Sequence, residues 1–156
     1  MALLETGKSA PLFTLPDQSG EKVALKSLRG EPVVLYFYPR ADTPGCTVQA
    51  CGIRDHRAQL RKAGVTVLGV SPDPVEAVAK FDSKHSLDFT LLADEDHKVA
   101  EKYGVWVEKS MYGKKYWGVQ RATYVIDSKG KIAHLIEKAS PKTHAEDILK
   151  LVGETP

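Results

Sequence analysis

The sequence contains two cysteines, Cys46 and Cys51, whose positions indicate thiol chemistry. Cys46 stands where an apolar, strand-like run ends and a helix-like pattern begins. A thiol in the first turn of a helix lies near unpaired backbone N–H groups, which stabilise the thiolate relative to the thiol. Thiolates attack electrophilic oxygen and sulfur atoms. The position of Cys46 therefore predicts redox or nucleophilic catalysis.

Other residues are needed for such a thiolate to react quickly, because the thiolate of a more acidic thiol is a weaker nucleophile. Speed must come from groups that position the partner atom and stabilise the transition state. Thr43 carries a hydroxyl that can both donate to and accept from a bound peroxide. Pro39 can shield the sulfur from water, and Arg121 can aim its guanidinium at the same place. Arg40 is expected to be a solvated charge, with a contribution to the positive field around Cys46 as the alternative.

The pattern of apolar residues predicts strands that alternate with helices, which is typical of a sheet covered on both faces. We expect an α/β, thioredoxin-like fold in which a mixed central sheet is flanked by helices and preceded by an N-terminal β-hairpin extension. Residues 1–156 are expected to form a single domain. The expected strands are 12–15, 22–25, 32–38, 65–70, 89–92, 122–126 and 131–136; the expected helices are 46–63, 74–85, one ending at Gly104, and 143–152; residues 107–120 are expected to form an irregular, basic, aromatic loop.

Composition argues against several other classes of protein. The net charge of +2, from 22 basic and 20 acidic residues, gives no reason to expect nucleic acid or an anionic membrane as partner. The sequence has neither an apolar run of the ~18 residues that a membrane span needs nor a secretory layout at its start. We therefore expect a cytoplasmic protein, where paired cysteines are more often catalytic or metal-binding than structural.

Several motifs together resemble a known family. The pattern Pro39-x-x-x-Thr43-x-x-Cys46 resembles the peroxiredoxin active-site motif, and Arg121-Ala122-Thr123 resembles the family's second, distant arginine motif. Wider segments, and a second cysteine five residues after the first, resemble the peroxiredoxin Q branch, also called bacterioferritin comigratory protein. These segments are Tyr36-Phe37-Tyr38-Pro39, Thr43-Pro44-Gly45-Cys46-Thr47 and Glu108-Lys109-Ser110-Met111-Tyr112-Gly113.

The resemblance implies a thiol-dependent peroxidase that reduces hydrogen peroxide and small organic hydroperoxides. It implies that Cys46 is the peroxidatic cysteine, that Cys51 is the resolving cysteine, and that Thr43, Arg121 and Pro39 complete the site. It also implies recycling by thioredoxin or a similar dithiol reductant, and a monomer. No metal, haem or flavin is expected, because two cysteines suffice for the electron transfer.

Helix geometry adds a prediction about the disulfide. Residues five apart on a regular helix have Cα atoms roughly 8.6 Å apart, whereas disulfides need less than about 7 Å. Cys46 and Cys51 therefore cannot bond while the helix is intact. We predict that oxidation unwinds its first turns, which Gly45 and Gly52 would ease.

Alternatives of other classes remain open at this point. Cys46, Cys51, His56 and Asp55 could ligate zinc, although structural zinc usually takes four ligands with closer cysteine spacing. A thioredoxin-like disulfide oxidoreductase would normally carry Cys-x2-Cys. A non-enzymatic redox sensor or holdase could use the same disulfide and would be oxidised only once.

The roles of some aromatic and charged residues also remain open. The segment Lys109–Trp117 either packs as a loop or walls the substrate pocket, and Trp106 is a candidate for core packing. Arg54 and Arg57 are expected to be solvated charges. The histidines are expected at the surface or at helix ends, without a catalytic role; they are His56, His85, His97, His134 and His144.

Overall fold

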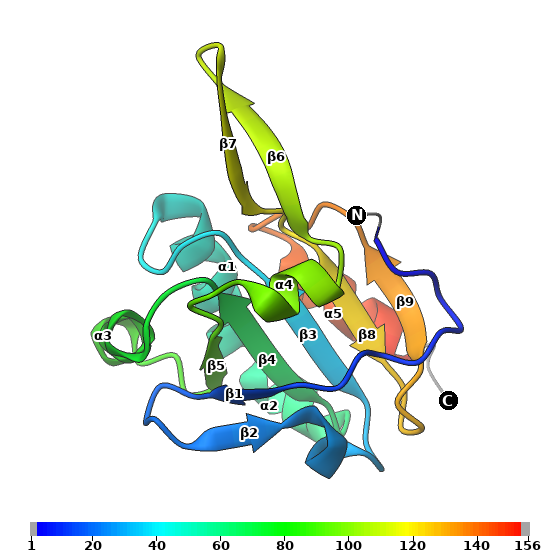
Figure 1. Cartoon of the computed structure of the whole chain (residues 1–156). Coiled ribbons are helices and arrows are strands. Elements are labelled where there is room, and N and C mark those ends of the chain that lie inside the picture. Colours follow the sequence, from blue (N-terminus) through cyan, green and yellow to red (C-terminus); the bar gives the residue numbers. More distant parts are fainter. Residues whose placement is uncertain (1–2, 154–156) are drawn as a thin grey trace.

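A five-stranded mixed sheet forms the centre of the computed structural model, which describes residues 3–153 (Figure 1). The strand order is β5-β4-β3-β8-β9, in which β3, β4 and β5 are parallel and β8 and β9 are antiparallel to their neighbours. The strands are β1 (Thr14–Pro16), β2 (Lys22–Ala24), β3 (Val33–Phe37), β4 (Thr66–Ser71), β5 (Thr90–Ala93), β6 (Trp106–Met111), β7 (Lys114–Val119), β8 (Thr123–Ile126) and β9 (Ile132–Ile136). The helices are the 3-10 helix η1 (Leu25–Leu28), α1 (Pro44–Asp55), α2 (Arg57–Lys62), α3 (Val75–His85), α4 (Lys98–Lys102) and α5 (His144–Gly153).

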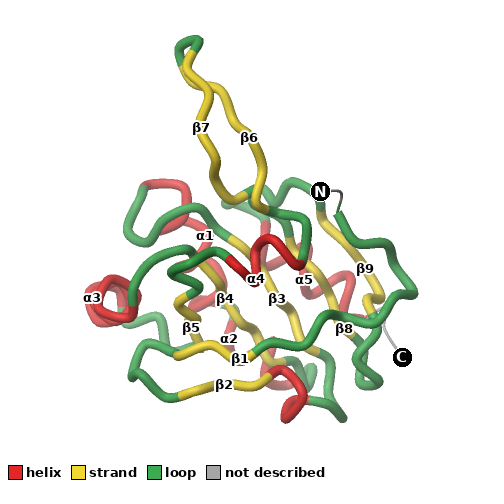
Figure 2. Tube along the Cα trace, in the orientation of Figure 1, coloured by secondary structure: helices red, strands yellow, loops and turns green. Residues whose placement is uncertain are grey.

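Both faces of the sheet are covered, as the continuous apolar run of β3 predicts. Leu35 and Phe37 point to the face that packs under the β1–β2 hairpin and α4. Val34 and Tyr36 pack on the other face, in a core cluster with buried residues of α1, α2, α3 and α5. Figure 2 traces these helices and the central sheet. The ring of Tyr36 lies so close to β4 that a Cβ on Gly69 would stand 2.8 Å from its Cζ atom, so the packing requires glycine there. The thioredoxin-like prediction, with its N-terminal hairpin β1–β2, is confirmed.

The prediction of an irregular loop over 107–120 is wrong. This segment forms β6 and β7, an antiparallel hairpin that projects from the body of the molecule (Figure 1). Tyr112 and Gly113 make the tight turn, with φ of 52° and 78°. Two consecutive positive φ values are typical of a type I′ turn, which usually has Asn or Asp where this chain has tyrosine. Because the hairpin projects into solvent, it also lacks the apolar alternation that reveals a half-buried strand.

The single helix predicted for residues 46–63 is divided in two. It begins earlier, at Pro44, and is interrupted at His56, where φ is −102° and ψ is 10°. The His56 ring donates to the Gly52 carbonyl at 2.9 Å, and the His56 backbone N–H donates to the same carbonyl. α1 therefore ends at Asp55 and α2 begins at Arg57, with His56 between them.

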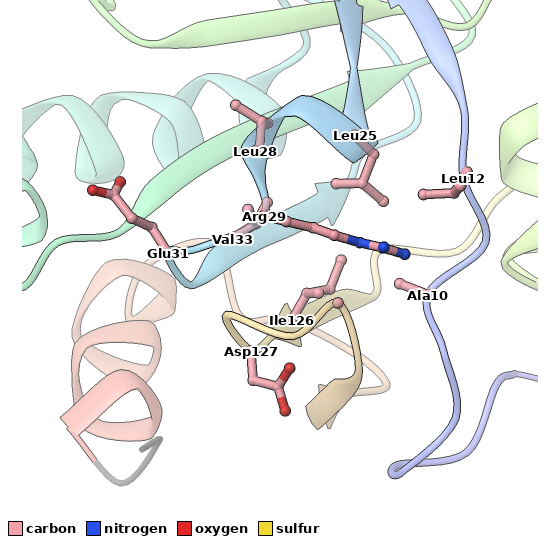
Figure 3. A pocket seen from close by; sticks show the side chains of 10 residues that line it. Ala10, Leu12, Leu25, Leu28, Arg29, Glu31, Val33, Ile126 and Asp127 are labelled. Atoms are coloured by element: carbon pink, nitrogen blue, oxygen red, sulfur yellow. The ribbon is translucent and has the colours of Figure 1, made fainter.

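A pocket at the end of β3 farthest from Cys46 is apolar (Figure 3). Leu25 and Leu28 of η1, Val33 of β3 and Ile126 of β8 line it, and the Arg29 side chain extends across it. Its lining contains the carboxylates Glu31 and Asp127 but neither of the two cysteines. The chemistry is expected instead at the carboxyl end of β3, where the chain enters α1.

Candidate active site

Cys46 lies in the first turn of α1, where helix geometry leaves backbone N–H groups without an intrahelical acceptor. Its side chain is buried, with 2% of its surface exposed. Thr43 occupies the N-cap position and Pro44 follows it at the start of the helix, a favoured place for proline. The helix therefore presents its positive end to the Cys46 sulfur, which favours the thiolate.

Arg121 reaches the same sulfur from the other side of the site. Its Nη1 atom lies 3.4 Å from Cys46 Sγ and 2.7 Å from Gln49 Oε1. Pairing of β8 with β3 places Arg121 here, because the Phe37 N–H donates to the carbonyl of Ala122 at 2.9 Å. A guanidinium can only donate hydrogen bonds, so its contact with the sulfur stabilises the anion.

Glycine at position 45 makes room for this arginine. A Cβ on Gly45 would lie 3.2 Å from Arg121 Nη2, which is closer than most real Cβ contacts. Any side chain here would push on the guanidinium that contacts Cys46. Packing against Arg121 therefore favours glycine at position 45, in addition to the backbone flexibility that the sequence suggested.

A buried network holds Arg121 from behind. Gln49 Nε2 lies 3.0 Å from His144 Nδ1, and His144 Nε2 lies 2.7 Å from Thr123 Oγ1. Gln49, Thr123 and His144 are fully buried. Burial, followed by the positive charge of Arg121, lowers the pKa of His144 to about 3, so its ring is neutral at ordinary pH.

The sequence placed His144 at the surface or at a helix end, without a catalytic role. The residue does stand at a helix end, because it begins α5, but it is buried and not at the surface. Neither Gln49 nor Thr123 was singled out from the sequence as a candidate, although Thr123 belongs to the arginine motif. No sequence signal joins these residues, because they come from α1, β8 and α5 and meet only when both helices pack on the sheet.

Cys51 shares the α1 helix with Cys46 and is partly buried against the core beneath it. Both cysteines are free thiols. Because α1 is continuous from Pro44 to Asp55, the separation worked out for an intact helix applies, and the two sulfurs cannot bond in this conformation.

The loop before α1 is anchored by the end of α3. Asp42, with a φ of 61°, accepts from Lys84 Nζ at 2.8 Å and pairs with His85 Nε2 at 3.0 Å. The hydrogen bonds from Lys84 and His85 lower the pKa of Asp42. The C-terminal end of α1 also contacts the end of α3, because Arg54 donates to the His85 carbonyl at 2.7 Å. The segment predicted to unwind is thus held at both ends by α3.

Thr43 and Pro39 lie beside the cysteine turn. Thr43 Oγ1 donates to the carbonyl of Arg40 at 2.9 Å, and its own lone pairs stay available as acceptors. Pro39 is partly buried and ends the run that follows β3. Their side chains come from the loop that carries Cys46, so the structure brings Pro39, Thr43, Cys46 and Arg121 to one end of the sheet.

The β6–β7 hairpin borders an open hollow next to this loop. Arg40 and Thr43 line it from the loop, and the hairpin contributes Met111, Tyr112, Lys114, Lys115 and Tyr116. The hairpin also sends Lys109 inward, where its ammonium group donates to the Val119 carbonyl. Burial lowers the pKa of Lys109, and Arg121 lowers it further, while Cys46 raises it.

The zinc alternative receives no support from the described residues. Among residues 3–153, no three side chains of His, Cys, Asp or Glu group in a way that could hold a metal ion. In the same part of the chain, no helix is long and apolar enough to cross a membrane.

Comparison with known proteins agrees with this geometry. A model of the AhpC/TSA family matches residues 6–135. The chain belongs to this family. It is 50% identical to peroxiredoxin Bcp of Escherichia coli K12 over 151 residues, which is 97% of each chain. It is 41% identical to peroxiredoxin Bcp of Bacillus subtilis, over 97% of this chain and 96% of the relative.

A solved structure shows the same fold. The bacterioferritin comigratory protein of Xanthomonas campestris, studied for alkyl peroxide reduction, superimposes with a TM-score of 0.88 at 30% identity, over 99% of this chain and 98% of that one. The resemblance to the peroxiredoxin Q branch is therefore confirmed. This AhpC/TSA member is a peroxiredoxin, a thiol peroxidase whose substrates are peroxides.

Proposed function

We propose that Cys46 is the peroxidatic cysteine of this peroxiredoxin and that Cys51 resolves it. The observation that carries this proposal is the 3.4 Å contact between Arg121 Nη1 and Cys46 Sγ at the N-terminal turn of α1. The helix end and the guanidinium both favour the thiolate, and the same guanidinium is placed to stabilise charge that develops on a peroxide oxygen.

The first step is attack of the Cys46 thiolate on one peroxide oxygen. The O–O bond breaks, the sulfur gains the oxygen as sulfenic acid, and the other oxygen leaves as water or an alcohol after it takes a proton. Thr43 would orient the peroxide through its hydroxyl, Arg121 would stabilise the breaking O–O bond, and Pro39 would keep bulk water from the sulfur.

The second step is resolution by Cys51. The first turns of α1 unwind, the Cys51 sulfur attacks the sulfenic acid, and water leaves as the disulfide forms. A dithiol reductant, which we propose to be thioredoxin, then supplies two electrons and two protons to regenerate both thiols. The cycle uses no electron carrier besides the two cysteines and this reductant.

The substrates proposed for the site are hydrogen peroxide and small organic hydroperoxides. Support comes from the hollow beside Thr43, where Met111, Tyr112 and Tyr116 of the β6–β7 hairpin offer an apolar wall. This arrangement favours the earlier alternative that the hairpin walls the substrate pocket. We propose further that residues 1–156 form one domain, and that the protein acts as a monomer in the cytoplasm.

The test is peroxide consumption with a thioredoxin recycling system. Cys46→Ser should lose all activity. Cys51→Ser should lose turnover but retain one fast, stoichiometric oxidation of Cys46. Full turnover of Cys51→Ser with thioredoxin would show that Cys51 does not resolve Cys46.

A further inference from the structure

We propose that His144 is a positioning residue for peroxide reduction, which acts through Gln49 to hold the Arg121 guanidinium against Cys46. The inference rests on the roles proposed above for Cys46 and Arg121. It assigns a function to a residue of the last helix, about a hundred positions away from the cysteine turn in the sequence. The structural basis is a chain of three short hydrogen bonds that ends on the arginine.

The direction of each hydrogen bond follows from the chemistry of its partners. Arg121 can only donate, so the Gln49 side chain must turn its oxygen toward the guanidinium, as the 2.7 Å contact shows. The amide NH2 of Gln49 then faces His144 Nδ1 at 3.0 Å and can only donate to it. His144 Nδ1 must therefore be unprotonated, which leaves the proton on Nε2.

The protonated Nε2 then donates to Thr123 Oγ1 at 2.7 Å, so the last link is fixed as well. A single tautomer of His144 satisfies all three contacts. Imidazolium would place an N–H against the NH2 of Gln49, so the network also requires the ring to stay neutral. The lowered pKa of His144 agrees with this requirement.

Packing fixes the ring in addition to hydrogen bonding. The Tyr36 ring meets the His144 ring edge to face, with centroids 5.2 Å apart and planes 70° apart. Tyr36 on β3 pairs directly with Thr123 on β8. One residue pair of the central sheet therefore supports both the His144 ring and the Thr123 hydroxyl that accepts from it. The central sheet thus fixes the position of the imidazole, and the hydrogen bond from Gln49 to His144 restrains the Gln49 side chain in turn.

Arg121 needs this support because its side chain is only partly buried and Nη1 alone makes its hydrogen bond to the sulfur. The arginine side chain has several rotatable bonds, and each must be fixed for the guanidinium to stabilise the transition state without reorganisation. Gln49 accepts the shorter of the two bonds from Nη1, so Gln49 sets where that nitrogen stands. Without the hydrogen bond to His144, the amide of Gln49 could rotate and release the guanidinium.

The experiment measures Cys46 directly, in a Cys51→Ser background. The rate of oxidation by hydrogen peroxide is compared with the rate of alkylation by iodoacetamide, which needs the thiolate but no peroxide geometry. Removal of the acceptor by His144→Leu should slow oxidation ~10-fold, as expected for a displaced catalytic group. Alkylation, measured at pH 10, should change by less than ~2-fold, because a cysteine thiol is largely ionised there with or without the contact from Arg121.

A conservative variant supplies the rescue. The Oδ1 atom of asparagine can stand near the place of His144 Nδ1 and accept from Gln49, so His144→Asn should oxidise within ~2-fold of the parent. Ile148→Val is the matched control, because Ile148 is a fully buried residue of the same helix outside the network. It should leave both rates unchanged even where it lowers the melting temperature.

A double-mutant cycle tests whether His144 acts through Gln49. Gln49→Met keeps the length of the side chain and removes its polar atoms. If the proposal holds, adding His144→Leu to Gln49→Met should slow oxidation no further, since the link is already broken. Thr123→Val, which replaces the hydroxyl with a methyl group, should give a smaller loss of the same kind. It is the variant to use if His144→Leu does not fold.

The tautomer has its own readout. The 15N resonances of the His144 ring in the reduced protein at pH 6 should show an unprotonated Nδ1 and a protonated Nε2. Imidazolium or the opposite tautomer would overturn the proposal, as would a His144→Leu variant that oxidises as fast as its parent or loses both rates equally. If the parent itself shows no oxidation of Cys46 by peroxide, the proposed function fails, which is a different result.

Discussion

Acidification should destabilise this protein through His144, and the size of the effect can be worked out. Burial lowers the pKa of His144 to about 3 in the folded state, against 6.5 for an unperturbed imidazole. Between these values the unfolded chain binds a proton at His144 and the folded chain does not. Protons therefore favour the unfolded state. The contribution of His144 to stability is fully present above pH 6.5 and is lost as the pH falls below it.

The magnitude follows from the two proton affinities. At pH 5 nearly all unfolded chains carry a proton on His144 and almost no folded chain does. The free energy of unfolding should then be about 2 kcal/mol lower at pH 5 than at pH 8 from this one residue. Domains of this size have ~5–15 kcal/mol in all, so the change is large enough to measure.

The assay is urea unfolding at a series of pH values, under reducing conditions, for the wild type and His144→Asn. Circular dichroism is the better probe, because the Trp106 ring stacks on His97 at 3.9 Å and its fluorescence would respond to His97 directly. Other titrating groups contribute equally to both proteins, so the difference between the two curves isolates His144. The variant should be less stable at pH 8 but flatter toward pH 5.

Parallel curves for the two proteins would refute this reasoning. They would mean that His144 takes up its proton in the folded state about as easily as in the unfolded chain. The His144 ring would then be protonated at pH 5 and could not accept the hydrogen bond from Gln49. The donors and acceptors of the network would not be those derived above.

Three further predictions concern the site and its loop. Hydrogen exchange at the start of α1 should be faster in the disulfide form than in the reduced form; equal protection would show that no unwinding occurs. Gly45→Ala should slow Cys46 oxidation in single-turnover measurements by ~10-fold, because the new Cβ presses on Arg121, while stability should hardly change. Asp42→Asn removes the ion pair with Lys84. It should speed disulfide formation by ~2- to 5-fold, which corresponds to the free energy of an exposed ion pair, and should lower the amount of sulfinic acid detected by mass spectrometry. Unchanged rates would show that the contacts of Asp42 do not limit unwinding of α1.

The sequence predicted the central sheet well because its strands have strong local signals. The apolar run that became β3 reads as a doubly covered strand, and the Asp127–Gly130 segment between β8 and β9 reads as a turn. The β6–β7 hairpin was missed because most of its residues are exposed and its turn is Tyr112-Gly113. The interruption at His56 was missed because it depends on a bond from a side chain to its own helix.

The residues of the proposed active site were predictable for a different reason. Pro39, Thr43 and Cys46 stand within eight positions of one another, so a local motif carries them. Arg121 is distant but belongs to a second motif. His144 has neither advantage: it interacts with the site only through Gln49, and its partners are fixed by the packing of α5 against α1 and β8. The spacing of these residues along the sequence therefore does not predict that they meet.

In the proposed cycle, the contacts that hold Arg121 against Cys46 are also contacts that delay resolution by Cys51. Gln49 lies three residues after Cys46, inside the part of α1 that must unwind before Cys51 can reach the sulfur. Unwinding therefore removes Gln49 from Arg121 and from His144 at once, in addition to the helix hydrogen bonds. A stronger network would speed the attack on peroxide but hold the sulfenic acid longer in the folded site, where a second peroxide can oxidise it further. A neutral amide at position 49, bonded to a neutral imidazole, gives a support that is directional yet carries no buried ion pair to break. This compromise follows from placing the support for the arginine on the same helix that has to open.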